Sequence, residues 1–596
     1  MAQLKSQTSK QISLEKRRLF QPVAPELRKN FGGAILYKFR EYHENETPNM
    51  EFPHGITNVE YVIAQDDNDL SGGLALSASA APEARAFLFI QSFVAELFDL
   101  GGNDSVGSPI IQVFQKHIMQ SRLGTHCIFG LRRQGIEIEE HSFAVHLDQN
   151  KRVVMVCCTY LPNLPGSFEE QSEFPDEPIR KALAGIDYEG AKAEKQWLVI
   201  WQGEGENKGY RIVPGSQVKL RRPTGKTQSI ASSINQANIL GITAEGVKKQ
   251  YRNSPGAYSK SIGLGKIIRN FFIETDKPQG IDALSDANIA SKQYQAVLRN
   301  LESNSELNGR YAAVQDEINT VTENRRGIFT RESGSSFDRV NAYYHLDYIQ
   351  RYFRENLDFQ ALDDYPHLNP VRIILKYRPN VLLAEYDVIT ERIFFHQIKK
   401  TETTAARDPR FIYHEFLHTV TDAIARMPRG GSASATARSQ ETLQAQAMDE
   451  GIADYFACSL AWQQGAQRAA FYFVKHGQWK LDRDLNPEHP SRVTITQFKD
   501  VDDSTWRTAK YRLGEQWARG LWRLHEQVGP EIADMLIAHS IFFLTRWATF
   551  RHGIQALRLA DRLLFSEEHK DEIREFENQI NIILDEEPLE ERYSAA

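Results

Sequence analysis

Residues 408–455 read DPRFIYHEFLHTVTDAIARMPRGGSASATARSQETLQAQAMDEGIADY, and this stretch predicts two helices. Asp408 followed by Pro409 is typical of a helix start, because the aspartate caps the first turn and proline needs no amide donor there. Gly430-Gly431 indicates the end of the first helix. Apolar residues recur at every fourth position in between, at Ile412, Phe416, Val420 and Ile424. One face of the first helix is therefore expected to be buried.

Two histidines in the first helix have the spacing of a metal-binding pair. His414 and His418 are four residues apart, so on a helix they lie on the same side and can hold one zinc ion. Glu415 lies beside them and can reach a water molecule at the metal. A catalytic zinc needs a third protein ligand, and Glu450 in the second helix is the candidate. Asp454, four residues further on, can accept the free N–H of a ligating histidine.

Two weaker explanations of this motif were considered. His-Glu-x-x-His occurs by chance in long chains, but here a helix start, a helix end and a second helix with Glu-Gly-x-Ala-Asp accompany it. A purely structural zinc is usually closed by four ligands rich in cysteine. The chain has four cysteines without zinc-finger spacing and without a disulfide framework: Cys127, Cys157, Cys158 and Cys458. The stretch therefore predicts a catalytic Zn²⁺ site.

The segment HEFLH, followed by DEGIADYF, resembles the gluzincin metallopeptidases of the thermolysin and fungalysin group. The long gap between the two helices and the aromatic residue after Asp454 are closer to fungalysin. The resemblance implies an α+β fold, in which β-rich propeptide modules precede a thermolysin-like catalytic domain. That domain is expected to have a β-rich N-terminal lobe, an all-helical C-terminal lobe, and the zinc in the cleft between them.

Composition and resemblance together divide the 596 residues into segments. Gly124-Thr125-His126, Gly135 and Leu161-Pro162 match the pattern of the propeptide module that precedes such catalytic domains. The expected segments are a polar N-terminal arm (1–50), this propeptide module (51–165), a second small propeptide module (170–225), a linker or helical connector (226–335) and the catalytic domain (336–590).

Local patterns predict elements within these segments. Apolar residues at helical spacing favour helices over 83–102 and 110–124, and 279–321 also reads as helical. Alternation from Phe143 onward and a polar turn at 148–151 predict a β-hairpin. The catalytic domain is expected to begin with strands at 371–377, 381–387 and 391–397, of which the last two form a hairpin just before the zinc helix.

The resemblance also suggests which residues handle the substrate. Relatives usually place Asn-Ala on a strand that binds the peptide backbone; Leu383-Ala384 stands there in this chain, so Ala384 is the expected substrate-binding residue. Fungalysins have His-x-x-Gly-x-x-Trp-Ala, and Tyr511 takes the place of the histidine. Its phenol can donate to an oxyanion. The alternative is that Tyr511 only packs and that the donor is one of three histidines, His525, His539 or His552.

Composition narrows the class of protein. The formal net charge of −7 is mild for this length and argues against a nucleic-acid-binding protein. No run of about 18 apolar residues predicts a membrane span. The N-terminus lacks the apolar core of a signal peptide, so the expectation is a cytoplasmic protein or one exported by a leaderless route.

The predicted function is that of a zinc metalloendopeptidase. It would hydrolyse peptide bonds of a protein or peptide substrate, with Glu415 as general base. The resemblance implies a precursor whose propeptide acts in cis to assist folding and inhibit the enzyme. Two alternatives remain open: a zinc aminopeptidase of the same superfamily, and a non-catalytic zinc-containing binding or scaffold protein.

Overall fold

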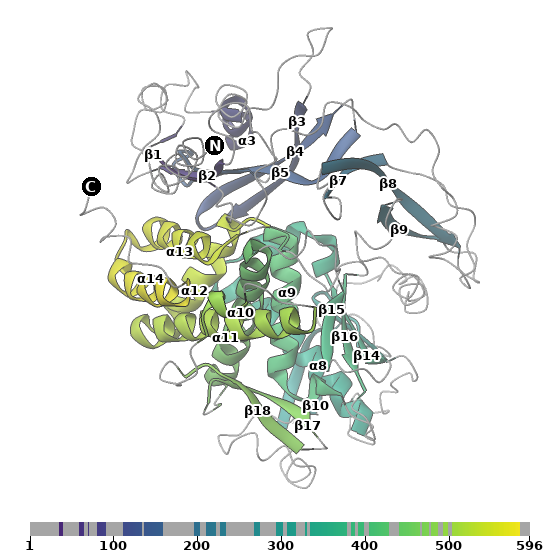
Figure 1. Ribbon diagram of the computed structural model, residues 1–596. Helices are drawn as coiled ribbons and strands as arrows, with labels where there is room; N and C mark the ends of the chain where they lie inside the picture. The colour runs from purple at the N-terminus through teal and green to yellow at the C-terminus, as the bar shows by residue number, and fades with distance from the viewer. Residues whose placement is uncertain are drawn as a thin grey trace, which may run out of the picture. The chain divides into compact units, whose positions relative to one another are not determined.

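The computed structural model in Figure 1 describes the chain in segments that belong to two compact units. The first unit comprises Met1–Pro175, Ala193–Gln217 and Ser233–Asn235, and the second comprises Asp176–Lys192, Val218–Ser232 and Gln236–Ala596. The residues described are 35–39, 59–64, 69–70, 80–90, 111–133, 136–158, 196–202, 210–221, 227–233, 267–273, 294–301, 307–316, 328–329, 334–377, 383–387, 391–397, 404–427, 440–464, 466, 468–475, 478–486, 493–498, 503–546 and 548–584.

The first unit is built on a mostly antiparallel sheet. Among the described residues its strands follow the order β1-β2-β6-β5-β7-β8, and β4, which pairs with β3, joins it at β5. The strands are β1 (Ile35–Phe39), β2 (Val59–Ala64), β3 (Ile111–Ser121), β4 (Gly124–Arg133), β5 (Ile136–Asp148), β6 (Val153–Cys158), β7 (Gln196–Gln202) and β8 (Tyr210–Arg221). The last four residues of β8 and all but the last residue of β9 (Thr227–Ser233) belong to the second unit. Helix α3 (Pro82–Phe89) packs against β4 and β5. It confirms the start of the helix predicted over 83–102, of which 91–102 lie outside the described residues.

The hairpin predicted from Phe143 onward is confirmed by β5 and β6. The side chains of Phe143, Val145 and Leu147 are buried, as expected for alternate residues of a strand with one face in the core. The turn is closed by Asp148, whose Oδ1 accepts the backbone N–H of Arg152 at 2.8 Å. Polar turn chemistry and alternation thus fix this hairpin together.

Two helix predictions are wrong, because strand pairing outweighs helical spacing of apolar residues. Residues 111–121 form β3, which pairs with β4 across a tight turn. Gly124 opens β4 at φ +139°, and a Cβ there would meet the Leu147 carbonyl oxygen at 2.0 Å, so only glycine fits. Within 279–321, the described residues include two strands, β11 (Tyr294–Leu301) and β12 (Ala312–Asp316), which pair with distant strands.

The second unit contains a four-stranded mixed sheet next to its helices (Figure 1). The strand order is β12-β14-β16-β15, with β12, β14 and β16 parallel and β15 antiparallel to β16. The three strands predicted before the zinc helix are β14 (Val371–Tyr377), β15 (Ala384–Asp387) and β16 (Arg392–His396). A smaller sheet, β11-β10-β13, adds β10 (Ile267–Ile273) and β13 (Ile328–Phe329). Helix α8 (Gly334–Arg351) packs against β12.

The C-terminal part of this unit is helical, as predicted, but not wholly. Its helices are α9 (Pro409–Ala425), α10 (Gln440–Gln463), α11 (Asp503–Val528), α12 (Pro530–Ser540), α13 (Phe550–Phe565) and α14 (Lys570–Leu584). A β-hairpin of β17 (Ala470–Lys475) and β18 (Gln478–Asp484) interrupts them. Helix α9 also ends earlier than Gly430-Gly431, because Arg426 takes the left-handed conformation, at φ 52°.

Helices α9, α10 and α11 lie side by side, and two glycines bring α10 and α11 close together (Figure 1). A Cβ on Gly451 would lie 2.6 Å from the carbonyl oxygen of Gly514, and a Cβ on Gly514 would lie 3.0 Å from the Cβ of Glu450. A side chain at either position would push the helices apart. This close approach occurs beside Glu450, so helix spacing sets the position of that side chain.

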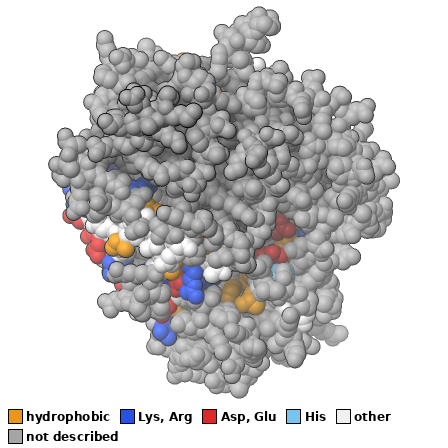
Figure 2. Space-filling model, viewed as in Figure 1, with side chains coloured by type: hydrophobic (Ala, Val, Ile, Leu, Met, Phe, Trp, Pro, Cys, Tyr) orange, Lys and Arg blue, Asp and Glu red, His pale blue; other side chains and the backbone are white. Residues whose placement is uncertain are grey.

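The distribution of charged side chains on the surface agrees with the mild net charge. On the face shown in Figure 2, acidic and basic side chains of the described residues are interspersed. No helix in the described part of the chain is long and apolar enough to cross a lipid bilayer.

A buried carboxylate ties three elements of the second unit together. Asp534 of α12 accepts hydrogen bonds from the hydroxyls of Tyr455 (2.5 Å) and Ser459 (2.9 Å), both on α10. It also accepts from Tyr352, which follows α8, at 2.6 Å, and from the Gln463 amide at 3.0 Å. Since Asp534 is fully buried, each of these donors would lose a charged acceptor without it.

Replacing this carboxylate should destabilise the second unit. Asp534→Ala is expected to lower the free energy of unfolding by at least about 3 kcal/mol, since each buried donor left without a partner costs about 1–3 kcal/mol. Chemical denaturation measures the change. The matched control is Glu531→Ala, an exposed position on the same helix. An Asp534→Ala unfolding curve that overlays the wild-type curve would contradict the prediction.

Candidate metal centre

Helix α9 carries the two predicted histidines, and its N-terminus is capped by a side chain. Asp408 accepts the backbone N–H of Arg410 at 3.0 Å, and the Arg410 guanidinium pairs with the same carboxylate at 2.7 Å. Pro409 occupies the first helical position. The predicted helix start is thus confirmed. One turn apart along this helix, His414 and His418 are both buried, and their rings lie edge to face with centroids 4.6 Å apart.

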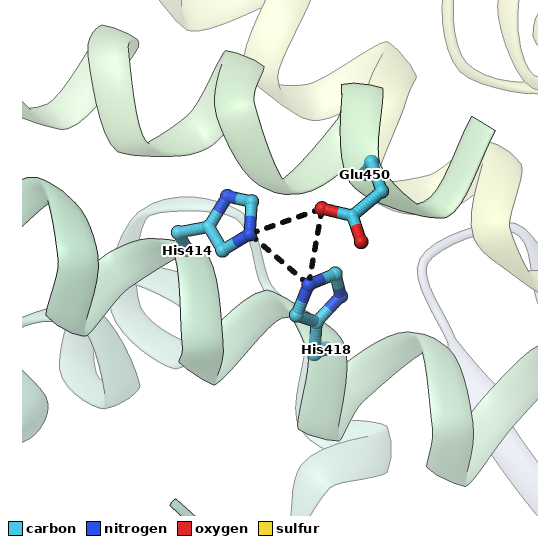
Figure 3. A group of neighbouring side chains, drawn as sticks. All are labelled: His414, His418 and Glu450. Atoms are coloured by element: carbon cyan, nitrogen blue, oxygen red, sulfur yellow. Dashed lines mark hydrogen bonds and ion pairs between the residues drawn. The ribbon is translucent and has the colours of Figure 1, made fainter. Parts of the chain in front are cut away.

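Three ligand atoms from two helices converge on one point (Figure 3). The Nε2 atoms of His414 and His418 are 3.1 Å apart. Oε2 of Glu450, from α10, lies 3.3 Å from the first and 3.7 Å from the second. All three side chains are buried, and their ligand atoms lie within 4.8 Å of one another. The structure therefore brings together the three side chains that were predicted as metal ligands.

The other ring nitrogen of each histidine faces a carboxylate. His414 Nδ1 lies 2.8 Å from Asp454 Oδ1, as predicted, and His418 Nδ1 lies 3.0 Å from Asp449 Oδ2. A carboxylate this close to Nδ1 favours, in the neutral ring, the tautomer with its proton on Nδ1 and its lone pair on Nε2. Thr421 donates to the second oxygen of Asp449, which holds that carboxylate in place.

These protonation states make the centre a cation site. Two nitrogen lone pairs and one carboxylate oxygen face one another in a buried space, and three acceptors in contact repel unless a cation lies between them. Two imidazoles and one carboxylate are a ligand set that zinc accepts in catalytic sites, with one position left for water or substrate. The residues present therefore fit a zinc ion.

Two cationic side chains support the acidic ones from outside. Arg483 of β18 donates to Asp454 Oδ2 at 2.7 Å, and Lys510 of α11 donates to Glu450 Oε1 at 2.6 Å. Phe471 of β17 packs edge-on against the His414 ring, with centroids 5.6 Å apart. The hairpin that interrupts the helices thus contributes to the surroundings of the metal ligands.

Burial and charge act against each other at the centre. Burial disfavours the charged form of His414, but Asp454 and Glu450 outweigh burial and raise the pKa of His414 to about 9. Burial likewise opposes ionisation of Glu450, while the Lys510 charge and both histidines hold its pKa well below the usual value. Without a metal ion, a proton on His414 compensates part of the negative charge, and an arriving ion must displace it.

Three further residues were predicted to take part in catalysis or substrate binding: Glu415, Tyr511 and Ala384. Glu415 is buried on α9 between the two histidines. The Tyr511 ring receives the Lys510 ammonium 4.5 Å from its centroid. Ala384 starts β15, one of the two outer strands of the four-stranded sheet among the described residues. The catalytic and substrate-binding roles of these three residues stay predictions.

The three histidines considered as alternatives to Tyr511 make packing or capping contacts. The His525 ring stacks on Trp522, with centroids 4.3 Å apart. His539 Nε2 lies 2.8 Å from the Leu357 carbonyl oxygen. His552 forms the capping box at the start of α13. These contacts account for all three rings structurally.

Sequence reasoning missed Asp449, Arg483 and Lys510. Asp449 could have been found, because it is an acidic residue that directly precedes Glu450 on the same helix. Arg483 and Lys510 are 29 and 60 positions away from the residues they contact, and no local pattern indicates those contacts.

The carboxylates behind the histidines should strengthen metal binding. Asp454→Asn is expected to weaken zinc binding about 10- to 100-fold, because it removes the charge that makes His414 a better ligand. Asp449→Asn should act in the same direction through His418. Competition with a chelator measures both affinities, with the exposed Asp571→Asn as control. Unchanged zinc affinity in both variants would refute this assignment.

A comparison with protein-family models agrees with the geometry of the centre. Residues 387–530 match the family model of the fungalysin metallopeptidases (M36), and this range contains both helices of the centre, Arg483 and Lys510. No curated protein matches the chain. The solved Bacillus megaterium YpeB C-terminal domain aligns with 38% of this chain and 92% of its own length at 10% identity, with a TM-score of 0.17. The chain therefore carries a fungalysin (M36) metallopeptidase domain, which makes it a hydrolase that uses zinc.

Proposed function

We propose that this metallopeptidase is an endopeptidase in which Glu415 is the general base. The observation that carries the proposal is the convergence of His414, His418 and Glu450 inside the matched domain. A zinc bound there by three protein ligands keeps one position for water or substrate, as hydrolysis requires. Protein or peptide chains are the substrates.

The chain's own residues move the protons of the reaction. Zinc, when bound, supplies a Lewis acid that polarises the scissile carbonyl and lowers the pKa of water to about 7. Glu415 takes one proton from the attacking water as its oxygen bonds to the carbonyl carbon. It returns this proton to the amide nitrogen as the C–N bond breaks, so the amine leaves neutral. Burial of Glu415 keeps bulk water from competing for the proton.

Tyr511 is proposed as the donor that stabilises the developing oxyanion. Its ring lies against Lys510, which contacts a metal ligand, and 5.4 Å from the guanidinium of Arg483, which contacts Asp454. These contacts hold the phenol next to the residues that surround the metal ligands. A phenol O–H directed at an oxyanion stabilises it by a hydrogen bond that strengthens in the transition state.

Strand β15 is proposed as the place where the peptide substrate adds to the sheet. It is an outer strand of the four-stranded sheet in the described part of the chain, and extended peptides commonly bind proteins by adding to an outer strand. The Tyr386 hydroxyl of β15 donates to Asp422 of α9 at 3.0 Å, which ties this strand to the helix of the two histidines. Ala384 would then contact the substrate through its backbone.

The segments 51–165 and 170–225 are proposed as a propeptide that acts in cis. Support comes from the match of Gly124-Thr125-His126 to the propeptide pattern and from the sheet-based first unit, which contains 51–165 and, of the second segment, 170–175 and 193–217. Limited proteolysis of the full chain tests this proposal. Cuts within 226–335 should raise peptidase activity, and a chain whose activity is unchanged by such cuts would contradict an inhibitory propeptide.

Removal of the general base should abolish turnover without loss of the metal. Glu415→Gln is expected to lower kcat/KM by about 10²- to 10⁴-fold, the usual contribution of a positioned base, with stoichiometric zinc retained. The assay uses an internally quenched peptide whose N-terminus is blocked. Glu355→Gln, at an exposed position outside the matched domain, is the control.

Each outcome of this assay separates the functions considered. Wild-type protein that holds zinc and cleaves no peptide, even after limited proteolysis, would favour a binding or scaffold protein. Cleavage of peptides with a free N-terminus but not of blocked ones would favour an aminopeptidase. In the same assay, Tyr511→Phe should lower kcat, and unchanged turnover would remove the oxyanion role from Tyr511.

A further inference from the structure

The two carboxylate oxygens of Glu450 have different partners. Oε2 faces the Nε2 atoms of His414 and His418, as Figure 3 shows, whereas Oε1 is the oxygen that Lys510 contacts. Lys510 Nζ lies 2.6 Å from Oε1 and donates to it. One oxygen is therefore directed at the metal position, and the other is held by a cation from a different helix.

Lys510 is itself held in place from more than one side. It lies on α11, the helix that Gly514 brings close to α10. Its ammonium group rests 4.5 Å from the centroid of the neighbouring Tyr511 ring, a favourable cation–π distance. The side chain is 22% exposed, whereas that of Glu450 is 6% exposed. Lys510 thus reaches the Glu450 carboxylate from a partly open side. A water molecule in place of its ammonium group would not make these contacts.

The contact matters because a carboxylate can bind a metal ion through one oxygen or both. A catalytic zinc has three protein ligands and keeps its fourth position for water or substrate. A second oxygen from Glu450 would compete for that position. A cation bound to Oε1 neutralises this oxygen and engages its lone pair, so the carboxylate offers only Oε2.

We propose that Lys510 is a positioning residue that reserves Oε1 of Glu450, so that Glu450 binds the metal through Oε2 alone and one coordination position stays available. This inference rests on the proposed zinc peptidase function. It concerns the number of oxygens that Glu450 supplies, which is a property of the metal site and can be measured without any substrate.

Cobalt(II) alone is the probe, loaded into the full chain in place of zinc. The visible absorption of cobalt weakens strongly when a four-coordinate ion gains a fifth or sixth ligand. Lys510→Met should therefore absorb markedly less per bound cobalt than wild type. Lys510→Arg, which keeps a cationic donor, should restore the wild-type intensity. Arg512→Met, on the same helix with a side chain 51% exposed, is the matched control and should equal wild type.

Kinetics of the zinc-loaded proteins supply a second readout. Because substrate and water lose a coordination position, Lys510→Met should lower kcat about 10- to 100-fold, the usual effect of removing a group that orients a metal ligand. KM should change little. A variant that lost activity only through unfolding would instead lose the cobalt spectrum and the wild-type circular dichroism together; in that event Lys510→Gln replaces it, with the same expected loss of absorption.

Two results would overturn the inference. One is a folded Lys510→Met protein with the wild-type cobalt spectrum, and the other is a Lys510→Arg protein whose spectrum is as weak as that of Lys510→Met. Failure of the proposed function looks different, because it shows in the wild type itself, as absence of stoichiometric cobalt or zinc or of peptide cleavage.

Discussion

The centre depends on holding like charges together in a buried space. Among the described residues, the carboxylates of Asp449, Glu450 and Asp454 lie within or directly behind the ligand set, and Arg483 and Lys510 pair with two of them. A divalent cation adds positive charge at the point where the ligand atoms meet. The raised pKa of His414 expresses the same demand, since a proton is another positive charge that can enter.

The scaffold meets this electrostatic demand by rigid helix packing. Gly451 and Gly514 allow α10 and α11 to approach until their backbones nearly touch, and this places Glu450 between the histidines of α9 and Lys510 of α11. Farther along α10, the buried carboxylate of Asp534 ties the same helix to α12 and to the segment after α8. A ligand set that repels itself without metal is thus held by contacts that do not depend on the metal.

The sequence specified the ligands well, because their geometry is local. Two histidines four residues apart on a capped helix must share one face, and Glu450 and Asp454 repeat the same spacing on the next helix. Contacts between distant segments were not predictable in this way. Arg483 and Lys510 reach the site from β18 and α11, and nothing near them in sequence indicates a partner. Residues 111–121 show the same limit, because pairing with β4 decides their conformation over their apolar spacing.

The central claim is that His414, His418 and Glu450 hold one zinc ion with a position left for water, and X-ray absorption at the zinc edge tests it most directly. The full chain loaded with one equivalent of zinc should show four nitrogen and oxygen neighbours at about 2.0–2.2 Å, with the outer-shell signal of two imidazoles. A sulfur neighbour at about 2.3 Å would place the ion on cysteine instead. A spectrum with that sulfur distance, or without two imidazoles, would contradict the account.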